Sequence, residues 1–174
     1  MGKIAVLGTG PSINLFGKEE PIKFDLTIGV NDIWKYVKSD VVVCLDRFSA
    51  FTPDRLKVIN ECKPKAFYSQ IVMWDKRPDF RKIEFQPGYP DRICNLDINQ
   101  LPKSYCSPFV ACVIAVKYYC ADEIHLFGVD LRNHPHLNGP LLEGVKKHFR
   151  NLKVSLTQKN CRLIVHGTGI LTEL

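Results

Sequence analysis

Short, nearly continuous apolar runs constrain the fold of this chain more than any other feature. They lie at residues 3–8 (KIAVLG), 24–30 (FDLTIGV) and 40–45 (DVVVCL). A strand with one solvated face alternates apolar and polar residues, whereas a strand covered on both faces is apolar throughout. These runs therefore predict interior strands of a sheet that has helices on both faces.

Helical segments are expected between these strands. A Ser or Thr followed by Pro is typical of a helix start, and this pattern occurs at Thr52 and at Ser107. The helix after Ser107 is apolar nearly all round, which indicates burial. Residues 140–159 carry apolar side chains at steps of three and four, which predicts a long amphipathic helix that ends at Asn160. Further strands are expected at residues 65–69, 82–85, 123–128 and 161–167.

Strands that alternate with helices predict an α/β fold with a mostly parallel sheet and helices on both faces. The length of 174 residues fits one domain, so we expect a single Rossmann-like domain over residues 1–174. Residues 71–104 are rich in Pro, Asp and Arg and predict an irregular excursion. Such a segment is either a substrate loop or a plain surface loop.

The composition is that of a water-soluble globular protein, with 45% hydrophobic and 24% charged residues. No apolar run approaches the ~20 residues of a membrane span. The chain opens directly on a strand, so we expect no signal peptide and a cytoplasmic protein. A homo-oligomer is left open.

The net charge and the spacing of the cysteines limit which ligands and partners are expected. The net charge of +6 favours an anionic ligand, but a basic solvated face explains it equally well. The Lys and Arg residues between positions 146 and 162 are interleaved with apolar residues, so nucleic acid is not the expected partner. The seven cysteines lack the paired spacing of a zinc site and are expected to be buried thiols.

Candidate ligand contacts follow from the topology, because open parallel sheets bind ligands beyond the carboxyl ends of their strands. This rule selects the residues that directly follow each expected strand. They are Thr9-Gly10-Pro11-Ser12, Asn31-Asp32, Asp46-Arg47, Gly128-Val129-Asp130 and His166-Gly167-Thr168-Gly169.

The turn VLGTGPS has the character of a phosphate-binding turn. Gly8 and Gly10 allow a sharp turn, and the backbone amides and the Ser12 hydroxyl are expected to face an anion. Ile13 stands where the dinucleotide pattern needs a third glycine, and the following helix is short, which disfavours NAD. A Walker-type phosphate sequence is absent. A tight structural turn without a ligand is the alternative.

The remaining candidates each have a functional and a structural interpretation. The Asn31 amide can bind a sugar hydroxyl or a phosphate oxygen, or cap the next helix. Asp46 can bind a ligand hydroxyl or a metal, or cap the next element. Ser107 can offer an anion or carbonyl site, or cap its helix. Gly128 suits close approach of a ligand to the backbone, and Asp130 can accept hydrogen bonds from a base or ribose.

Histidines supply the candidates for general base catalysis. His134 and His136 lie in the loop RNHPHLNG between an expected strand and the long helix, where a histidine can act as a base near pH 7. A pair of surface histidines is the alternative. His125 lies inside a strand and His148 on the long helix, so both are expected to be structural. His166 ends the last strand, and its role is left open.

Three segments together suggest a family. VLGTGPS, IGVNDIW and SPFVACVIAVKYYCADEIHLFGVDL resemble the small bacterial sialyltransferases that use CMP-sialic acid. They equally resemble Rossmann-like proteins described as 6-hydroxymethylpterin diphosphokinase-like. The first resemblance implies that Ser107, Gly128 and Asp130 border the cytidine, and that His136, or else His134, is the general base. It also implies nucleotide contacts from the turn and from the asparagine after the second strand, namely Gly8, Gly10, Pro11, Ser12 and Asn31.

The resemblance makes glycosyl transfer from a CMP-type donor to an acceptor hydroxyl the leading function, with no cofactor required. The sequence departs from the sialyltransferases in having no tyrosine between Asp130 and Arg150, where residues that hold the leaving phosphate are expected. The pterin resemblance implies ATP-dependent pyrophosphoryl transfer with Mg²⁺ held by Asp46 or Asp130. A non-catalytic nucleotide-binding protein is the third possibility.

Overall fold

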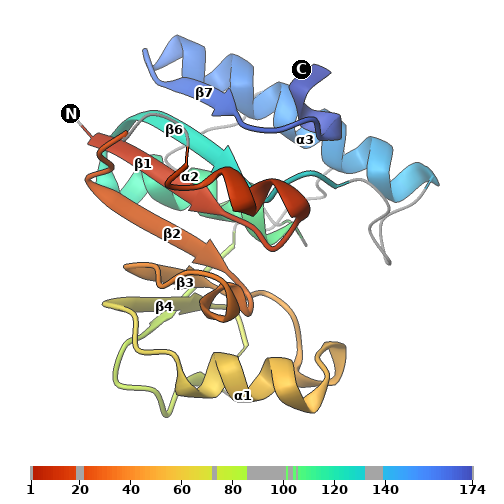
Figure 1. The fold of residues 1–174 in the computed structure, drawn as a ribbon. Coiled ribbons are helices and arrows are strands. Elements are labelled where there is room, and N and C mark those ends of the chain that lie inside the picture. Colours follow the sequence, from red (N-terminus) through yellow and green to blue (C-terminus); the bar gives the residue numbers. More distant parts are fainter. Residues whose placement is uncertain are drawn as a thin grey trace.

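A seven-stranded parallel sheet forms the centre of the computed structural model (Figure 1). The structure describes residues 2–18, 22–71, 74–85, 101, 104, 106–131 and 139–173, the last with its backbone alone. The strand order is β5-β4-β3-β2-β1-β6-β7, and every pairing is parallel. The strands are β1 (Gly2–Leu7), β2 (Leu26–Val30), β3 (Val41–Val43), β4 (Ala66–Ser69), β5 (Phe80–Lys82), β6 (Ala121–Phe127) and β7 (Arg162–Val165).

Helices cover both faces of this sheet, which confirms the expected α/β class. α2 (Ser107–Tyr119) and α3 (Gly139–Gln158) pack on one face, and α1 (Pro53–Glu61) packs on the other. Three short 3-10 helices lie on the face of α1: η1 (Pro11–Leu15), η2 (Ile33–Lys35) and η3 (Phe48–Ala50). A fourth, η6 (Ile170–Glu173), follows β7. None of the described helices is long and apolar enough to cross a membrane.

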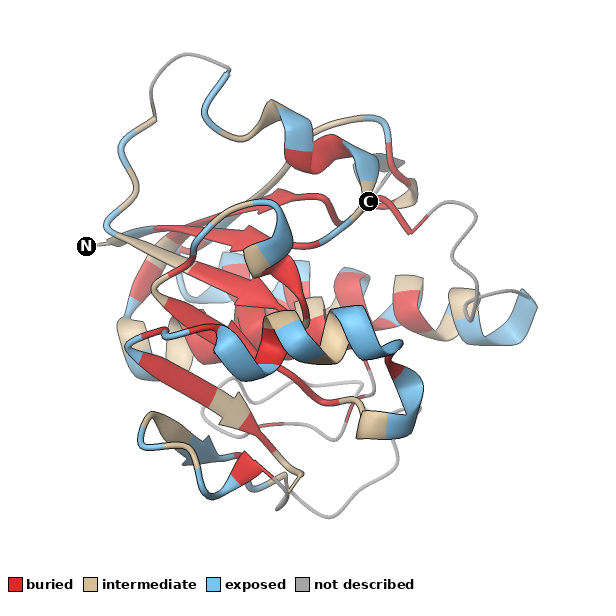
Figure 2. Cartoon of the chain, turned by 60° about the horizontal axis from the view of Figure 1, so that its bottom comes forward, coloured by how far each residue is buried: buried red, intermediate tan, exposed pale blue. Residues whose placement is uncertain are grey.

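The continuous apolar runs are explained by the two cores that the sheet separates. In β1, Ile4 and Val6 pack against α2 and α3, while Ala5 and Leu7 pack on the opposite face. Val42 of β3 likewise faces away from its two neighbours. The central strands are consequently buried along their length, whereas α1 is exposed on its outer side (Figure 2).

The order of the strands fixes where a ligand can bind. The chain builds outward from β1 to β5 on one side and then returns through α2 to place β6 on the other side of β1. In open α/β sheets, the crevice for ligands lies where this direction reverses. The carboxyl ends of β1 and β6 are therefore the natural centre of a site.

Several boundaries differ from the sequence-based expectation. β5 begins at Phe80, earlier than the expected 82–85, because its register pairs Phe80 with Phe67. Ser107 is the first residue of α2 and does not cap it, since Cys106 holds the extended cap position. The sheet is entirely parallel within the described strands, and not only mostly so. Of the expected excursion at 71–104, residues 72–73, 86–100 and 102–103 lie outside the described residues.

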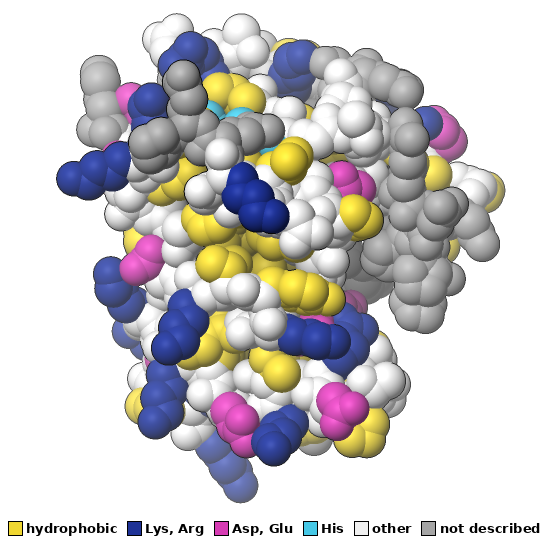
Figure 3. All heavy atoms as spheres, viewed as in Figure 1, with side chains coloured by type: hydrophobic (Ala, Val, Ile, Leu, Met, Phe, Trp, Pro, Cys, Tyr) yellow, Lys and Arg dark blue, Asp and Glu magenta, His cyan; other side chains and the backbone are white. Residues whose placement is uncertain are grey.

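Most of the described cysteines are buried, as the sequence predicts. Five of the six described cysteines are buried, Cys120 is exposed, and Cys94 lies outside the described residues. Burial raises the pKa of Cys106 to about 12 and that of Cys161 to about 11, so both thiols stay protonated near neutral pH. Figure 3 shows Lys and Arg side chains scattered around an apolar strip, with no basic block on this face.

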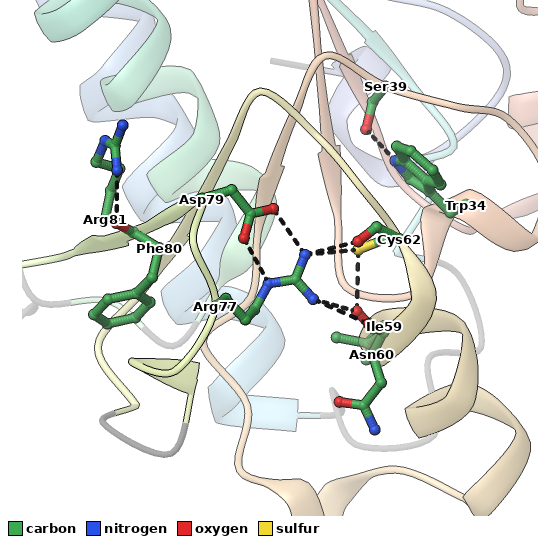
Figure 4. Close-up of polar contacts among 9 residues, drawn as sticks. All are labelled: Trp34, Ser39, Ile59, Asn60, Cys62, Arg77, Asp79, Phe80 and Arg81. Atoms are coloured by element: carbon green, nitrogen blue, oxygen red, sulfur yellow. Dashed lines mark hydrogen bonds and ion pairs between the residues drawn. The ribbon is translucent and has the colours of Figure 1, made fainter.

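Arg77 anchors the end of α1 to the start of β5 (Figure 4). Its guanidinium donates to both carboxylate oxygens of Asp79, at 2.9 and 2.8 Å. It also donates to the carbonyl oxygens of Ile59 and Cys62, each at 2.8 Å, and lies 4.3 Å from the centroid of the Phe67 ring. One side chain thus satisfies carbonyls that the end of a helix leaves unpaired.

Replacing Arg77 is expected to destabilise the fold. In Arg77→Ala, the Asp79 carboxylate and the α1 carbonyls lose their donor, so the free energy of unfolding should fall by about 3 kcal/mol. The free energy of unfolding of Arg77→Lys should lie between those of the wild type and Arg77→Ala, because a lysine ammonium cannot reproduce the planar, forked guanidinium. Arg81 donates to the Phe80 carbonyl in an exposed position and is the matched control. Urea denaturation checks this, and equal stability of Arg77→Ala and Arg81→Ala would contradict the anchor.

Candidate functional site

Two glycine-containing loops interlock at the carboxyl ends of β1 and β6. We define the first glycine loop as residues 8–12 and the second glycine loop as residues 127–130. The Gly8 amide donates to the Phe127 carbonyl at 2.7 Å, and the Gly10 amide donates to the Gly128 carbonyl at 2.8 Å. The Ser12 amide donates to Oδ2 of Asp130 at 2.9 Å, and the Gly128 amide donates to Oγ of Ser12 at 2.8 Å.

The glycines are needed because the two backbones approach so closely. A Cβ atom at Gly8 would lie 2.3 Å from the Gly128 carbonyl oxygen. A Cβ at Gly128 would lie 2.2 Å from the Gly8 carbonyl oxygen, and Gly128 also has a φ of +67°. A Cβ at Gly10 would lie 2.5 Å from Oδ2 of Asp130. Each distance is far below van der Waals contact, so a side chain at any of the three would force the loops apart.

This interlock uses the amides that we expected to face an anion. The amides of Gly8, Gly10 and Ser12 donate within the protein, and that of Ile13 donates to the Gly10 carbonyl at 3.0 Å. Pro11 has no amide hydrogen. Thr9 is exposed, and in this loop its amide alone has no acceptor in the described part of the chain. The first glycine loop is thus mainly a device that grips the second glycine loop.

A third segment closes the interlock from behind. We define the C-terminal turn as residues 166–170. The Ile170 amide donates to the Asp130 carbonyl at 2.9 Å, and a Cβ at Gly169 would lie 2.6 Å from Cα of Asp130. Gly167 has a φ of +94°, and its Cβ would lie 2.5 Å from Cβ of Ser12. The turn therefore packs directly on Ser12 and Asp130.

A second polar cluster lies at the carboxyl ends of β2 and β3. Nδ2 of Asn31 donates to Oδ2 of Asp46 at 3.1 Å. The Ser107 hydroxyl, at the first turn of α2, donates to Oδ1 of Asn31 at 3.5 Å. Asn31 and Asp46 are half-buried. Side chains from three separate segments thus meet at this edge of the sheet. We call Asn31, Asp46 and Ser107 the open cluster, because solvent reaches Asn31 and Asp46.

Asp32, the acid in the position that suits a dinucleotide ribose, is committed elsewhere. Its carboxylate accepts from Nε and Nη2 of Arg55, at 3.0 and 2.6 Å, and only 4% of Asp32 is exposed. The hydrogen bonds that Arg55 donates to Asp32 raise the pKa of its guanidinium. This acid ties α1 to the end of β2 and is not presented to a ligand.

Two residues with a left-handed backbone conformation, Asn31 and Leu131, also lie at the carboxyl edge of the sheet. Four described non-glycine residues have a positive φ. Cys120 and Asn160 end α2 and α3, where this conformation is common. The other two, Asn31 at 52° and Leu131 at 56°, directly follow β2 and the second glycine loop. Leucine in this conformation costs about 1–2 kcal/mol, and such strain gathers at functional sites.

The structure therefore brings most of the candidates to one edge of the sheet. Asp46, Asn31, the two glycine loops and the C-terminal turn follow strands β3, β2, β1, β6 and β7, which are neighbours in that order. His134 and His136 lie outside the described residues. Sequence reasoning selected residues 166–169 as a candidate but missed that they support Ser12 and Asp130. The two glycines in that segment were the available signal.

Among the described residues, no group of three or more His, Cys, Asp or Glu side chains is arranged to hold a metal ion. The carboxylate of the open cluster is that of Asp46.

Comparison with known proteins gives a fold relationship. No family model matches the chain, and no curated protein matches it. Among solved structures, the chain is similar to a point mutant of the α-2,3/8-sialyltransferase CstII. The TM-score is 0.60, the sequence identity is 17%, and the match covers 98% of this chain and 84% of the other. The chain thus has the fold of this sialyltransferase, whereas none of these comparisons supports the pterin resemblance.

The glycine interlock makes a sharp prediction. Gly128→Ala should lower the free energy of unfolding by several kcal/mol, because backbone atoms of Gly8 block the new methyl group. Gly17→Ala is the matched control, since Gly17 has a φ of +78° but no atom within 4 Å of a Cβ. The control should cost about 1–2 kcal/mol from the left-handed conformation alone. Thermal and urea unfolding measure both, and equal losses would refute the interlock.

Proposed function

We propose that this chain is a glycosyltransferase that binds a CMP-type nucleotide sugar along the carboxyl edge of its sheet. The sugar would pass to an acceptor hydroxyl. The supporting observation is that the chain shares the fold of a sialyltransferase over 98% of its length. The cluster of buried Ser107 with half-buried Asn31 and Asp46 also lies beside the reversal of strand order, where such folds bind ligands.

The open cluster and the first glycine loop would bind different parts of the nucleotide. In the open cluster, the Asn31 amide and the Asp46 carboxylate are suited to the hydroxyl and amino groups of a nucleoside. A phosphate is suited to the amide of Thr9, an exposed residue of the first glycine loop whose amide has no acceptor in the described part of the chain. Ser12 and Asp130, each at least 91% buried and bonded to the opposite loop, position this surface from behind.

The proposed chemistry is a displacement at the anomeric carbon. A histidine, His136 or else His134, removes the proton of the acceptor hydroxyl as its oxygen bonds to the anomeric carbon. The bond from that carbon to the phosphate oxygen breaks, and CMP leaves with the electron pair. No tyrosine lies between Asp130 and Arg150 to stabilise this charge. Arg132 is the nearest cation in sequence to take that role.

A Mg²⁺-dependent pyrophosphoryl transfer would use the same edge differently. Mg²⁺ usually binds one or two carboxylates together with substrate phosphates. Asp46 is the carboxylate of the cluster formed with Asn31 and Ser107, and it accepts a hydrogen bond from Asn31. This activity would be abolished by a chelator and by Asp46→Asn, whereas sugar transfer from a CMP-type nucleotide sugar would survive the chelator.

Nucleotide binding can be tested with a matched pair of variants. CMP and CDP should raise the melting temperature with or without Mg²⁺, whereas UDP, GDP, ATP and NAD should not. Asn31→Gly removes the amide but tolerates the φ of 52°, so it should weaken CMP binding by about 1–3 kcal/mol. Asn160→Gly is the control, because Asn160 has a φ of 55° at the end of α3 and should bind CMP normally. Stabilisation by NAD alone would overturn the proposal.

The role of the loop histidines is tested by kinetics. His136→Ala, or else His134→Ala, should slow sugar transfer by about 10²–10⁴-fold, the usual contribution of a general base. The affinity for CMP should not change, because the base acts on the acceptor. Release of CMP from CMP-sialic acid, followed with and without acceptors, measures the rate. Binding of CMP without turnover in the wild type would instead indicate a non-catalytic binder.

A further inference from the structure

A line of buried polar side chains runs along β6 toward the C-terminal turn. Glu123 and His125 are two residues apart in the strand and therefore share one face of the sheet. Oε1 of Glu123 lies 2.8 Å from Nε2 of His125, and Nδ1 of His125 lies 2.8 Å from Nε2 of His166. Glu123 is 5% exposed and His125 is 3% exposed.

The first member of this line is held as an anion. The Glu123 carboxylate accepts from His125 and pairs with Arg162 of β7, while Nζ of Lys3 lies 3.3 Å from its Oε1. The hydrogen bond from His125 is the main cause that lowers the pKa of Glu123, with Lys3 and Arg162 adding to it. An ionised carboxylate only accepts hydrogen bonds, so Nε2 of His125 carries a proton.

That assignment limits how many protons the two histidines can hold. With both rings neutral, Nδ1 of His125 accepts a hydrogen bond from Nε2 of His166. One added proton keeps a hydrogen bond between the rings, because one nitrogen still donates and the other accepts. A second added proton would place two N–H groups and two positive charges face to face at this contact. The pair therefore accepts one proton but must separate to accept two.

The surroundings of His125 also oppose its charge. Desolvation by burial is the main cause that lowers the pKa of His125, and the nearby His166 and Lys3 lower it further, against the opposing effect of Glu123. The ring of Phe24 packs edge-on at 5.1 Å. Of the charged groups in the described part of the chain, Glu123 on β6 contacts His125 directly, and Lys3 on β1 and Arg162 on β7 pair with Glu123.

His166 connects this line to the candidate site. Its ring stacks on Phe127 with centroids 4.0 Å apart and planes 9° apart, and its amide donates to the Leu126 carbonyl at 2.9 Å. His166 is also the first residue of the C-terminal turn, in which Gly167 packs on Ser12 and Gly169 packs on Asp130. A shift of the His166 ring is therefore transmitted over one residue to the support of the glycine interlock.

We propose that Glu123, His125 and His166 form a pH-sensitive brace, which positions the C-terminal turn behind Ser12 and Asp130 and loosens when it is acidified. The brace belongs to the apo fold, and its effect on nucleotide affinity rests on the proposed function. In the unfolded chain, histidine titrates near pH 6.5. Because the pKa of folded His125 is lower, the unfolded chain binds more protons below about pH 6.5. The contribution of His125 to the stability of the fold is therefore fully present above about pH 6.5 and is lost as the solution is acidified.

The brace is tested first without any ligand. Between pH 7.5 and 5.0 the wild-type melting temperature should fall, and His166→Gln should reduce this fall. The glutamine amide can still donate to Nδ1 of His125 but cannot become charged. His148→Gln is the control, since His148 is a buried histidine of α3 that packs on Phe109, away from the brace. An unchanged pH dependence in His166→Gln would overturn the brace.

Nuclear magnetic resonance provides a readout that a purely structural role would not move. The His125 ring should carry its proton at Nε2 at pH 7.5 and should titrate below pH 6.5. The amide signals of Ser12 and Gly167 should shift with the same midpoint. Independent titration of His125 near pH 6.5, with static Ser12 and Gly167 signals, would contradict the proposal.

The ligand arm separates this inference from the proposed function. If CMP binds, its affinity should fall about fivefold or more between pH 7.5 and 5.0 in the wild type, and less in His166→Gln, as expected for coupling between two sites. Protonation of CMP itself affects the wild type and His166→Gln equally, so it cancels when the two proteins are compared. If CMP does not bind, the proposed function fails, while the melting and resonance measurements still decide the brace. Equal pH dependence of CMP binding in both proteins would remove the link to the site.

Discussion

The interlock of the two glycine loops is the contact on which the rest of the carboxyl edge depends. Its four hydrogen bonds join segments more than 100 residues apart in the chain, and the Ser12–Gly128 and Ser12–Asp130 bonds are buried. An unpaired amide or carboxylate in this position would cost several kcal/mol, so the bonds hold both loops in one arrangement. β1 and β6 are central neighbours in the sheet, and the interlock therefore fixes the point at which strand order reverses.

This arrangement changes how a glycine-rich turn after the first strand should be interpreted. In a phosphate-binding turn, glycines let the backbone approach a ligand, and amides point toward its charge. Here the glycines let one backbone approach another, and the Asp130 carboxylate takes the Ser12 amide that a phosphate would otherwise receive. Among the described residues, the exposed Thr9 and the half-buried Asn31–Asp46 pair are accessible to a ligand at this edge. A site of this kind would select a nucleoside mainly through side chains.

Much of the architecture was predictable from local sequence because burial on both faces leaves an unmistakable apolar run. Ser or Thr followed by Pro also located the starts of α1 and α2 to within a residue. The carboxyl-end rule then selected Asn31, Asp46 and Gly128 without knowledge of the strand order. The partners of Ser12, Asp32 and His125 were not predictable, because each lies on another element and only the folded topology brings it within hydrogen-bonding distance. The predicted start of β5 was wrong for the same reason, because the register of β5 depends on its pairing with β4.

The central claim is that the carboxyl edge of the sheet binds a cytidine nucleotide, and amide chemical-shift mapping with CMP tests it most directly. The account predicts that the signals of Thr9, Asn31 and Asp46 move on titration, while those of the groove between α3 and β7, near Lys153 and Leu163, stay in place. Shifts confined to that groove, or scattered over α1 and β5, would contradict the account.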